Sequence, residues 1–179
     1  AAFEVAVNSQ IYVDKTGLLA YTNSVINTKQ ALICSSRPRR FGKSITADML
    51  CAYYSRGCDS DSIFASYEIA KSDSYKKYLN QYDVIYLDIQ WCMMDAGSAE
   101  QTVSYLNYHV IEELKEIYPQ ILLDGIRTAY GAMSCINAQT GVKFIVIIDE
   151  WDVLIRDEAA NEAVLQDYIN FLRGMFKGS

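Results

Sequence analysis

The spacing of apolar residues along the chain predicts several helices. In residues 98–118, apolar side chains return every three or four positions while charged side chains occupy the other side, the pattern of an amphipathic helix. Pro119 follows directly and would end that helix. The same spacing predicts helices over residues 17–26, 45–53, 121–136 and 161–176, and a polar, exposed helix over 72–81.

A short apolar run at residues 31–34 and two runs rich in β-branched and aromatic residues, at 84–91 and 144–148, predict strands. The last run has five consecutive apolar residues, which is typical of a central parallel strand buried on both faces. The order of strands and helices predicts an α/β fold with a parallel sheet. Three strands are few for the complete core of such a domain. We therefore expect residues 1–179 to be one domain, truncated at its C-terminus, that forms the N-terminal part of a longer protein.

Composition narrows the class of protein. The chain is 51% hydrophobic and 21% charged, which is typical of a soluble globular domain. No apolar run approaches the ~18 residues of a membrane-spanning helix, and the start of the chain has no signal-peptide pattern. A net charge of −6 argues against a direct nucleic-acid footprint. These features favour a cytoplasmic protein without a membrane partner.

Cysteine and histidine usage gives little support to a metal centre. Five cysteines are widely spaced, without a Cys-x-x-Cys pair, and we expect reduced, mostly buried thiols. His109 is the only histidine and lies within the predicted helix 98–118. Without metal-ligand spacing around it, it is more typical of a solvated or packed side chain than of a zinc ligand.

The most informative stretch is residues 31–54, where a predicted strand, a turn and a predicted helix enclose Gly42-Lys43-Ser44. Unpaired amides and the helix dipole at a helix start hold polyphosphate groups. Glycine lets the backbone approach the phosphates, lysine places an ammonium on the outer phosphates, and the serine hydroxyl can ligate Mg²⁺. An ordinary basic turn is the alternative interpretation.

This loop departs from the usual Gly-x-x-x-x-Gly-Lys-Ser/Thr pattern, because Arg37 stands at the first glycine and Pro38 removes one amide donor. Arg37, Arg39 and Arg40 would partly compensate as cationic, planar phosphate donors. The predicted nucleotide-binding residues are Arg39, Arg40, Phe41, Gly42, Lys43, Ser44 and Ile45.

A second candidate element is the end of the predicted strand 144–148, where Asp149 and Glu150 follow directly. Sites in parallel sheets form beyond the carboxyl ends of the strands. We expect Asp149 and Ser44 to hold Mg²⁺, and Glu150 to act with Lys43 as a catalytic residue by polarising the attacking water. Two carboxylates that merely end a strand in solvent are the alternative.

Two weaker candidates remain open. Asp88 lies near the end of the predicted strand 84–91 and could either face a phosphate site or simply end its strand. We favour a strand-end carboxylate without a ligand role. Tyr12, Val13 and Asp14 wrap the nucleotide base or form a plain edge segment.

Four of these stretches, in this order, resemble the predicted AAA-type ATPase family of bacteria, the AAA-ATPase-like domain. They are residues 12–16, the arginine-rich loop 37–44, the strand 84–88 and the acidic segment 147–152. The family usually has Tyr where Trp151 stands. The arginine-rich loop is specific to this family, so the missing first glycine looks like a family trait.

The resemblance implies a three-layer P-loop NTPase fold of the RecA/AAA type, a parallel sheet with helices on both faces, that uses ATP and Mg²⁺. Many relatives look like fusions to a restriction-type nuclease domain, so a nuclease-like domain in the longer chain and self-association are the partners it suggests. The implied activity is ATP hydrolysis that drives a conformational change in a partner domain or assembly.

Two other functions compete with an ATPase. A nucleotide-dependent switch or assembly module would bind ATP and turn it over little or not at all. A P-loop kinase fits less well, because adjacent Asp149 and Glu150 suit water activation better than transfer to a bound acceptor. No Asn-Lys-x-Asp motif is present to indicate GTP.

Overall fold

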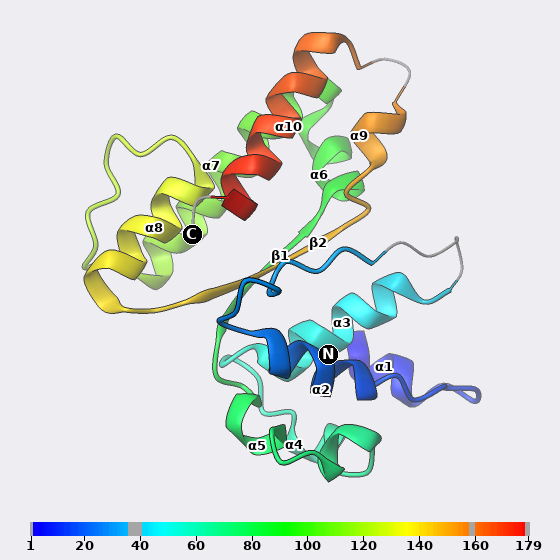
Figure 1. The fold of residues 1–179 in the computed structure, drawn as a ribbon. Helices are drawn as coiled ribbons and strands as arrows, with labels where there is room; N and C mark the ends of the chain where they lie inside the picture. Colours follow the sequence, from blue (N-terminus) through cyan, green and yellow to red (C-terminus); the bar gives the residue numbers. More distant parts are fainter. Residues whose placement is uncertain (1, 36–40, 158–159, 178–179) are drawn as a thin grey trace. The chain divides into compact units, whose positions relative to one another are not determined.

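The computed structural model describes residues 2–35, 41–157 and 160–177 (Figure 1). The chain divides into two compact units, residues 1–84 and 85–179, and each is described by itself below. Within the described ranges, no helix combines the length and apolar character needed to cross a bilayer.

The first unit is built from short helices. They are α1 (Ala2–Val7), α2 (Gly17–Val25), α3 (Lys43–Tyr54), α4 (Asp61–Phe64), the 3₁₀ helix η1 (Glu68–Lys71) and α5 (Tyr75–Tyr78). Aromatic side chains fill its core: Phe3 stacks on Phe64 with ring centroids 5.2 Å apart, and Tyr53 meets Phe64 edge-on at 5.4 Å. The buried hydroxyls are satisfied, since Asn23 donates to Tyr53 and accepts from Tyr54. The longest helix of this unit, α3, is thus anchored by its C-terminal tyrosines.

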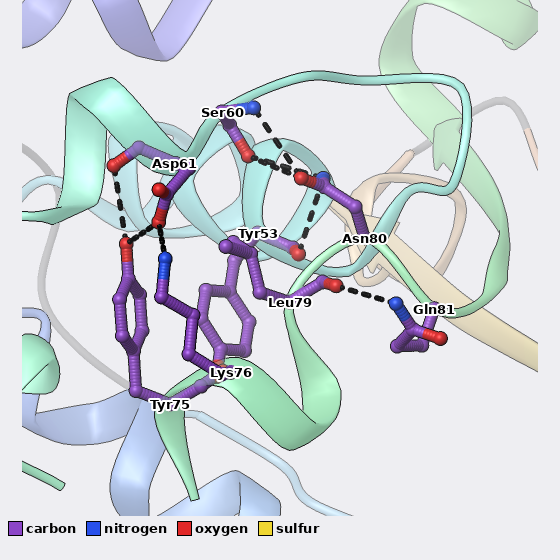
Figure 2. Close-up of polar contacts among 8 residues, drawn as sticks. All are labelled: Tyr53, Ser60, Asp61, Tyr75, Lys76, Leu79, Asn80 and Gln81. Atoms are coloured by element: carbon purple, nitrogen blue, oxygen red, sulfur yellow. Dashed lines mark hydrogen bonds and ion pairs between the residues drawn. The ribbon is translucent and has the colours of Figure 1, made fainter.

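Asn80 secures the C-terminal end of α3 (Figure 2). Its side-chain amide donates to the carbonyls of Ala52 and Ser55 at 3.1 and 2.8 Å and to the Ser60 hydroxyl at 3.0 Å. Its backbone amide donates to the Tyr53 carbonyl at 2.7 Å. The last carbonyls of a helix have no partner within the helix, so these bonds satisfy groups that would otherwise be left unpaired.

We expect Asn80→Gly to destabilise the first unit by about 2 kcal/mol, because it removes several part-buried hydrogen bonds worth ~1 kcal/mol each. Glycine keeps the left-handed backbone that Asn80 adopts (φ 54°), so the substitution does not strain the folded backbone. Urea unfolding followed by circular dichroism measures it. A midpoint equal to that of the wild type would show that the side-chain bonds contribute nothing.

The second unit combines a small sheet with helices. Its elements are β1 (Asp83–Asp88), which begins at the boundary between the units, α6 (Ile89–Ala96), α7 (Ala99–Ile117), α8 (Ala129–Thr140), β2 (Phe144–Asp149), α9 (Val153–Arg156) and α10 (Glu162–Lys177). β1 and β2 pair in parallel as a two-stranded sheet. The longest helix, α7, packs against α6, α8 and α10 (Figure 1). The architecture is therefore mixed α/β with a small, open parallel sheet.

Alternate residues of the two strands face the core of this unit. Ile85 and Leu87 from β1 and Phe144, Val146 and Ile148 from β2 pack against the helices. This period of two is that of a sheet covered by helices on one face. The expected burial of residues 144–148 on both faces is not observed, because these side chains are half-buried.

Most of the predicted elements are confirmed. The helices expected at 17–26, 45–53, 98–118 and 161–176 are α2, α3, α7 and α10, and the strands expected at 84–91 and 144–148 are β1 and β2. β1 ends three residues early, because Asp88 caps α6 by accepting the Trp91 amide at 3.0 Å.

Other predictions are wrong. Residues 31–34 form no strand, because no described strand pairs with them. The side chains of Leu32 and Ile33 are 61% and 45% exposed. The helix expected at 121–136 starts at residue 129, where Thr128 caps it by accepting the Gly131 amide at 3.1 Å. Only residues 75–78 of the polar stretch 72–81 form an α-helix, and Tyr75 is buried. The helix α1 has no counterpart among the predicted elements.

Candidate phosphate loop and acidic strand end

The predicted phosphate loop leads directly into α3. Gly42 is the N-cap residue, with a left-handed backbone (φ 76°, ψ 34°), and Lys43 and Ser44 are the first two residues of this twelve-residue helix. The Gly42 carbonyl accepts the Thr46 amide at 3.0 Å, which is the first bond of the helix. Glycine has no side chain that could cap the amides of the first turn, and a helix cannot satisfy these amides internally. This end of α3 is therefore suited to an anion.

The exposure of the loop differs from residue to residue. Phe41 and Ile45 are 61% and 42% exposed, and Lys43 is half-buried at the start of the helix. Arg39 and Arg40, with Arg37 and Pro38, lie outside the described residues, so their predicted contribution to phosphate binding stays a prediction.

One cation near the loop was not among the predicted site residues. The Lys15 ammonium donates to the Phe41 carbonyl at 2.7 Å, although 26 positions separate the two residues. The sequence predicts a role only for Tyr12, Val13 and Asp14 of segment 12–16, and none for Lys15. No hydrophobic periodicity relates residue 15 to residue 41, so the only sequence signal is the presence of a lysine within this motif.

The second half of the predicted site lies at the end of β2. Asp149 is the last residue of the strand and is buried, with 7% exposure. One carboxylate oxygen, Oδ1, accepts the Glu150 amide at 2.9 Å. The other, Oδ2, is shielded from solvent and has no hydrogen-bond partner among the described residues. A buried carboxylate oxygen without a partner is costly, and an added ligand would offset that cost.

Glu150 sits in a strained turn after the strand. Its backbone is left-handed (φ 48°), a conformation that a non-glycine residue adopts at an energetic cost and that is often found at functional sites. Its carboxylate lies 3.4 Å from the Arg156 guanidinium of α9. The turn is fixed from α10 as well, because the buried Tyr168 donates its hydroxyl to the Trp151 carbonyl at 2.6 Å. The backbone turn therefore sets the direction of the Glu150 side chain, and the ion pair with Arg156 holds its carboxylate.

Each half of the predicted site, taken separately, contains an oxygen donor suited to magnesium. The orphaned Oδ2 of Asp149 and the hydroxyl of Ser44 are the hard oxygen ligands that Mg²⁺ prefers. Magnesium usually keeps several waters and takes one or two protein ligands, so it does not need a dense cluster of acidic groups. The described residues contain no group of three or more His, Cys, Asp or Glu side chains that could hold a metal ion.

The remaining candidates have structural roles. Asp88 caps α6, which supports the strand-end interpretation. Tyr12 packs edge-on against Phe3 and Tyr67, with ring centroids 6.0 and 5.4 Å away, and Asp14 binds backbone amides. His109 is exposed on α7 and lies against the rings of Tyr105 and Tyr108.

The cysteines do not form a reactive centre. All five are free; Cys34 is exposed and the others are only half-buried, so the expectation of mostly buried thiols is wrong. Burial, with the nearby charge of Asp48, raises the pKa of the Cys51 thiol to about 12, and burial also raises the pKa of Cys92. These two thiols are protonated at neutral pH and are poor nucleophiles.

The structure thus describes the two halves of the predicted site separately. Residues 41–45 lie together at the start of α3 in the first unit, and Asp149 and Glu150 lie together at the end of β2 in the second.

Comparison with known proteins gives one match. Neither the curated proteins nor the solved structures include a protein that matches the chain. A family model described as "Predicted AAA-ATPase" matches residues 3–179, a range that includes both the phosphate loop and the acidic strand end. Because this match covers nearly the whole chain, the protein belongs to the Predicted AAA-ATPase family.

Proposed function

We propose that the protein binds ATP with Mg²⁺ and hydrolyses it to ADP and phosphate. The observation that carries this proposal is the left-handed Gly42 at the start of α3, followed at once by Lys43 and Ser44. Backbone amides, an ammonium and a hydroxyl are then in the order that a polyphosphate with its metal requires. Membership of the Predicted AAA-ATPase family supports the same nucleotide.

In the proposed site, each residue has one role. Lys43 binds the outer phosphates, while Ser44 and the Oδ2 of Asp149 hold Mg²⁺, which neutralises phosphate charge when bound. Glu150 accepts a proton from a water whose oxygen attacks the γ-phosphorus. The bond from that phosphorus to the β–γ bridging oxygen breaks, and ADP leaves with that oxygen.

This function requires the two units to come together around one nucleotide. We propose that the protein has the three-layer P-loop NTPase fold, in which β1 and β2 are two of the parallel strands. We also propose that the ATP cycle drives a conformational change in a partner domain or assembly. The free thiols agree with a reducing, cytoplasmic location.

A nucleotide-dependent switch is the second candidate, and one contact favours it. The ion pair of Glu150 with Arg156, at 3.4 Å, occupies the carboxylate that hydrolysis would use as a base. A protein that keeps this pair after binding ATP would turn over little nucleotide.

Calorimetric titration of the protein with ATP tests the proposal, first with Mg²⁺ and then with excess EDTA. We expect saturable binding of one ATP per chain with Mg²⁺ and at least tenfold weaker binding without it, because the metal neutralises phosphate charge beside Asp149. No binding of ATP under either condition would refute the proposed function.

Gly42→Ala should weaken ATP binding about tenfold. A left-handed alanine costs about 1–2 kcal/mol, and tenfold corresponds to ~1.4 kcal/mol. The added Cβ would also lie 2.9 Å from the Lys15 ammonium. The matched control is Gly17→Ala at the start of α2, whose Cβ would meet nothing closer than 4.0 Å. Equal ATP affinity in the two variants would show that the loop conformation is irrelevant to binding.

A further inference from the structure

The segment 12–16 is held rigidly within the first unit. The Asp14 carboxylate accepts the backbone amides of Thr16 at 2.7 Å and of Glu68 at 2.9 Å. The Thr16 hydroxyl, which is fully buried, accepts the amide of Ile69 at 3.1 Å. A short turn of the chain is thereby closed by one internal hydrogen bond and fixed to the start of η1 by two others.

The charge state of Asp14 agrees with this arrangement. Burial alone would raise the pKa of its carboxyl, but the amides of Glu68 and Thr16 outweigh burial and lower the pKa below its ordinary value. The carboxylate is therefore ionised at neutral pH, and its two amide bonds are charge-assisted.

Lys15 extends from this fixed turn to the phosphate loop. Its ammonium donates to the Phe41 carbonyl at 2.7 Å and lies so close to Gly42 that a Cβ there would be 2.9 Å away. Position 42 thus requires glycine for two reasons, because the backbone there is left-handed and because a side chain would obstruct the approach of Lys15.

Holding the Phe41 carbonyl also sets the direction of the next amide. In a trans peptide the C=O and the following N–H point in opposite directions. With the Phe41 carbonyl directed at Lys15, the Gly42 N–H must point to the opposite side of the peptide plane. The orientation of the Gly42 amide is then determined by a lysine 26 positions before Phe41.

We propose that Lys15 is a positioning residue of the phosphate loop, which holds the Phe41–Gly42 peptide so that the loop amides are ordered before a polyphosphate arrives. This inference rests on the proposed function for the identity of the ligand. Asp14 and Thr16 fix the turn from which Lys15 acts, so the whole segment 14–16 serves the loop.

Three variants test the role of Lys15. Lys15→Met keeps the length of the side chain but removes its donor, and Lys15→Arg retains a cationic donor. Lys71→Met is the matched control, because Lys71 is an exposed lysine of the same unit that pairs with Glu68 beside the clamped turn. Circular dichroism verifies that all three fold.

The first readout is the backbone order parameter from nuclear magnetic resonance relaxation, without nucleotide. In Lys15→Met we expect the order parameters of the amides of residues 42–44 to fall from about 0.85, the value of a rigid backbone, to below about 0.6, while those of Glu68 and Ile69, which bond Asp14 and Thr16, keep their values. Lys15→Arg and Lys71→Met should match the wild type. Unchanged order parameters in residues 42–44 of Lys15→Met, or lower values at Glu68 and Ile69 as well, would overturn the proposal.

The second readout is ATP affinity with Mg²⁺ by calorimetry. We expect binding to Lys15→Met to weaken about threefold to tenfold, with recovery in Lys15→Arg and no change in Lys71→Met. Wild-type affinity in Lys15→Met would refute the positioning role and leave the proposed function intact. If no protein binds ATP but the loop amides still respond to Lys15→Met, the proposed function fails and the positioning role stands.

Discussion

Lys43→Ala should abolish ATP binding and leave the fold intact. The ammonium of Lys43 lies in the first turn of α3, where the backbone is already suited to an anion, and it is the group that we assign to the outer phosphates. The substitution removes the positive charge that offsets the mutual repulsion of the phosphate groups of bound ATP. We expect a loss of affinity of at least about 10²-fold, equal to ~2.7 kcal/mol. Calorimetric titration with ATP and Mg²⁺ measures the affinity, and circular dichroism measures the fold.

The matched control for this variant is Lys29→Ala, which removes an exposed lysine of the same unit. Net charge changes equally in the two variants, so a nonspecific electrostatic effect would weaken both. Unchanged affinity in a folded Lys43→Ala protein would show that the loop is an ordinary basic turn.

Glu150→Gln should keep ATP binding and lose phosphate release. The amide has nearly the shape of the carboxylate and accepts the same left-handed backbone, but it cannot take a proton from water. General-base catalysis contributes about 10²–10⁴-fold, so we expect release of phosphate to fall by that factor. Single-turnover phosphate release, measured beside a titration with ATP and Mg²⁺, separates the chemical step from binding.

Asp152→Asn is the control for Glu150→Gln, because Asp152 is the other carboxylate that pairs with Arg156, at 2.8 Å. It should release phosphate at nearly the wild-type rate. Little release from both the wild type and Glu150→Gln would favour the switch over the enzyme. Rapid release from Glu150→Gln would exclude Glu150 as the base.

The parts of the fold that sequence predicts well are those with their own periodic signal. α7 and α10 each place apolar residues on one helical face, and β2 is a run of β-branched and aromatic residues, so each is evident without its neighbours. Residues 31–34 show the limit of that reasoning. An apolar run becomes a strand only when another strand pairs with it, and no described strand does so.

Capping side chains explain most of the errors at element boundaries. Asp88 and Thr128 each accept a hydrogen bond from the amide three residues ahead. The Asp88 cap starts α6 where composition alone predicts that the strand continues. The Thr128 cap starts α8 later than the predicted helix. The structure also places Ile117 with 64% exposure, although its spacing assigns it to the buried face of α7.

The candidate site could likewise be predicted only where the signal lies in the local sequence. Gly42, Asp149 and Glu150 are found from sequence because each lies directly at the end of a predictable element. The left-handed backbone of Glu150 and the orphaned oxygen of Asp149 are properties of the folded chain. The contact of Lys15 with Phe41 joins two loops that no periodic pattern relates, so only the structure reveals it.

The central claim is that the loop at Lys43 and the strand end at Asp149 meet around one nucleotide. A crystal structure of the protein with a non-hydrolysable ATP analogue and Mg²⁺ tests it most directly. We predict one analogue with its outer phosphates at the Lys43 ammonium and its Mg²⁺ bound by Ser44 and by Asp149, directly or through one water. An analogue held at Lys43 with Asp149 on the opposite side of the molecule would contradict the account.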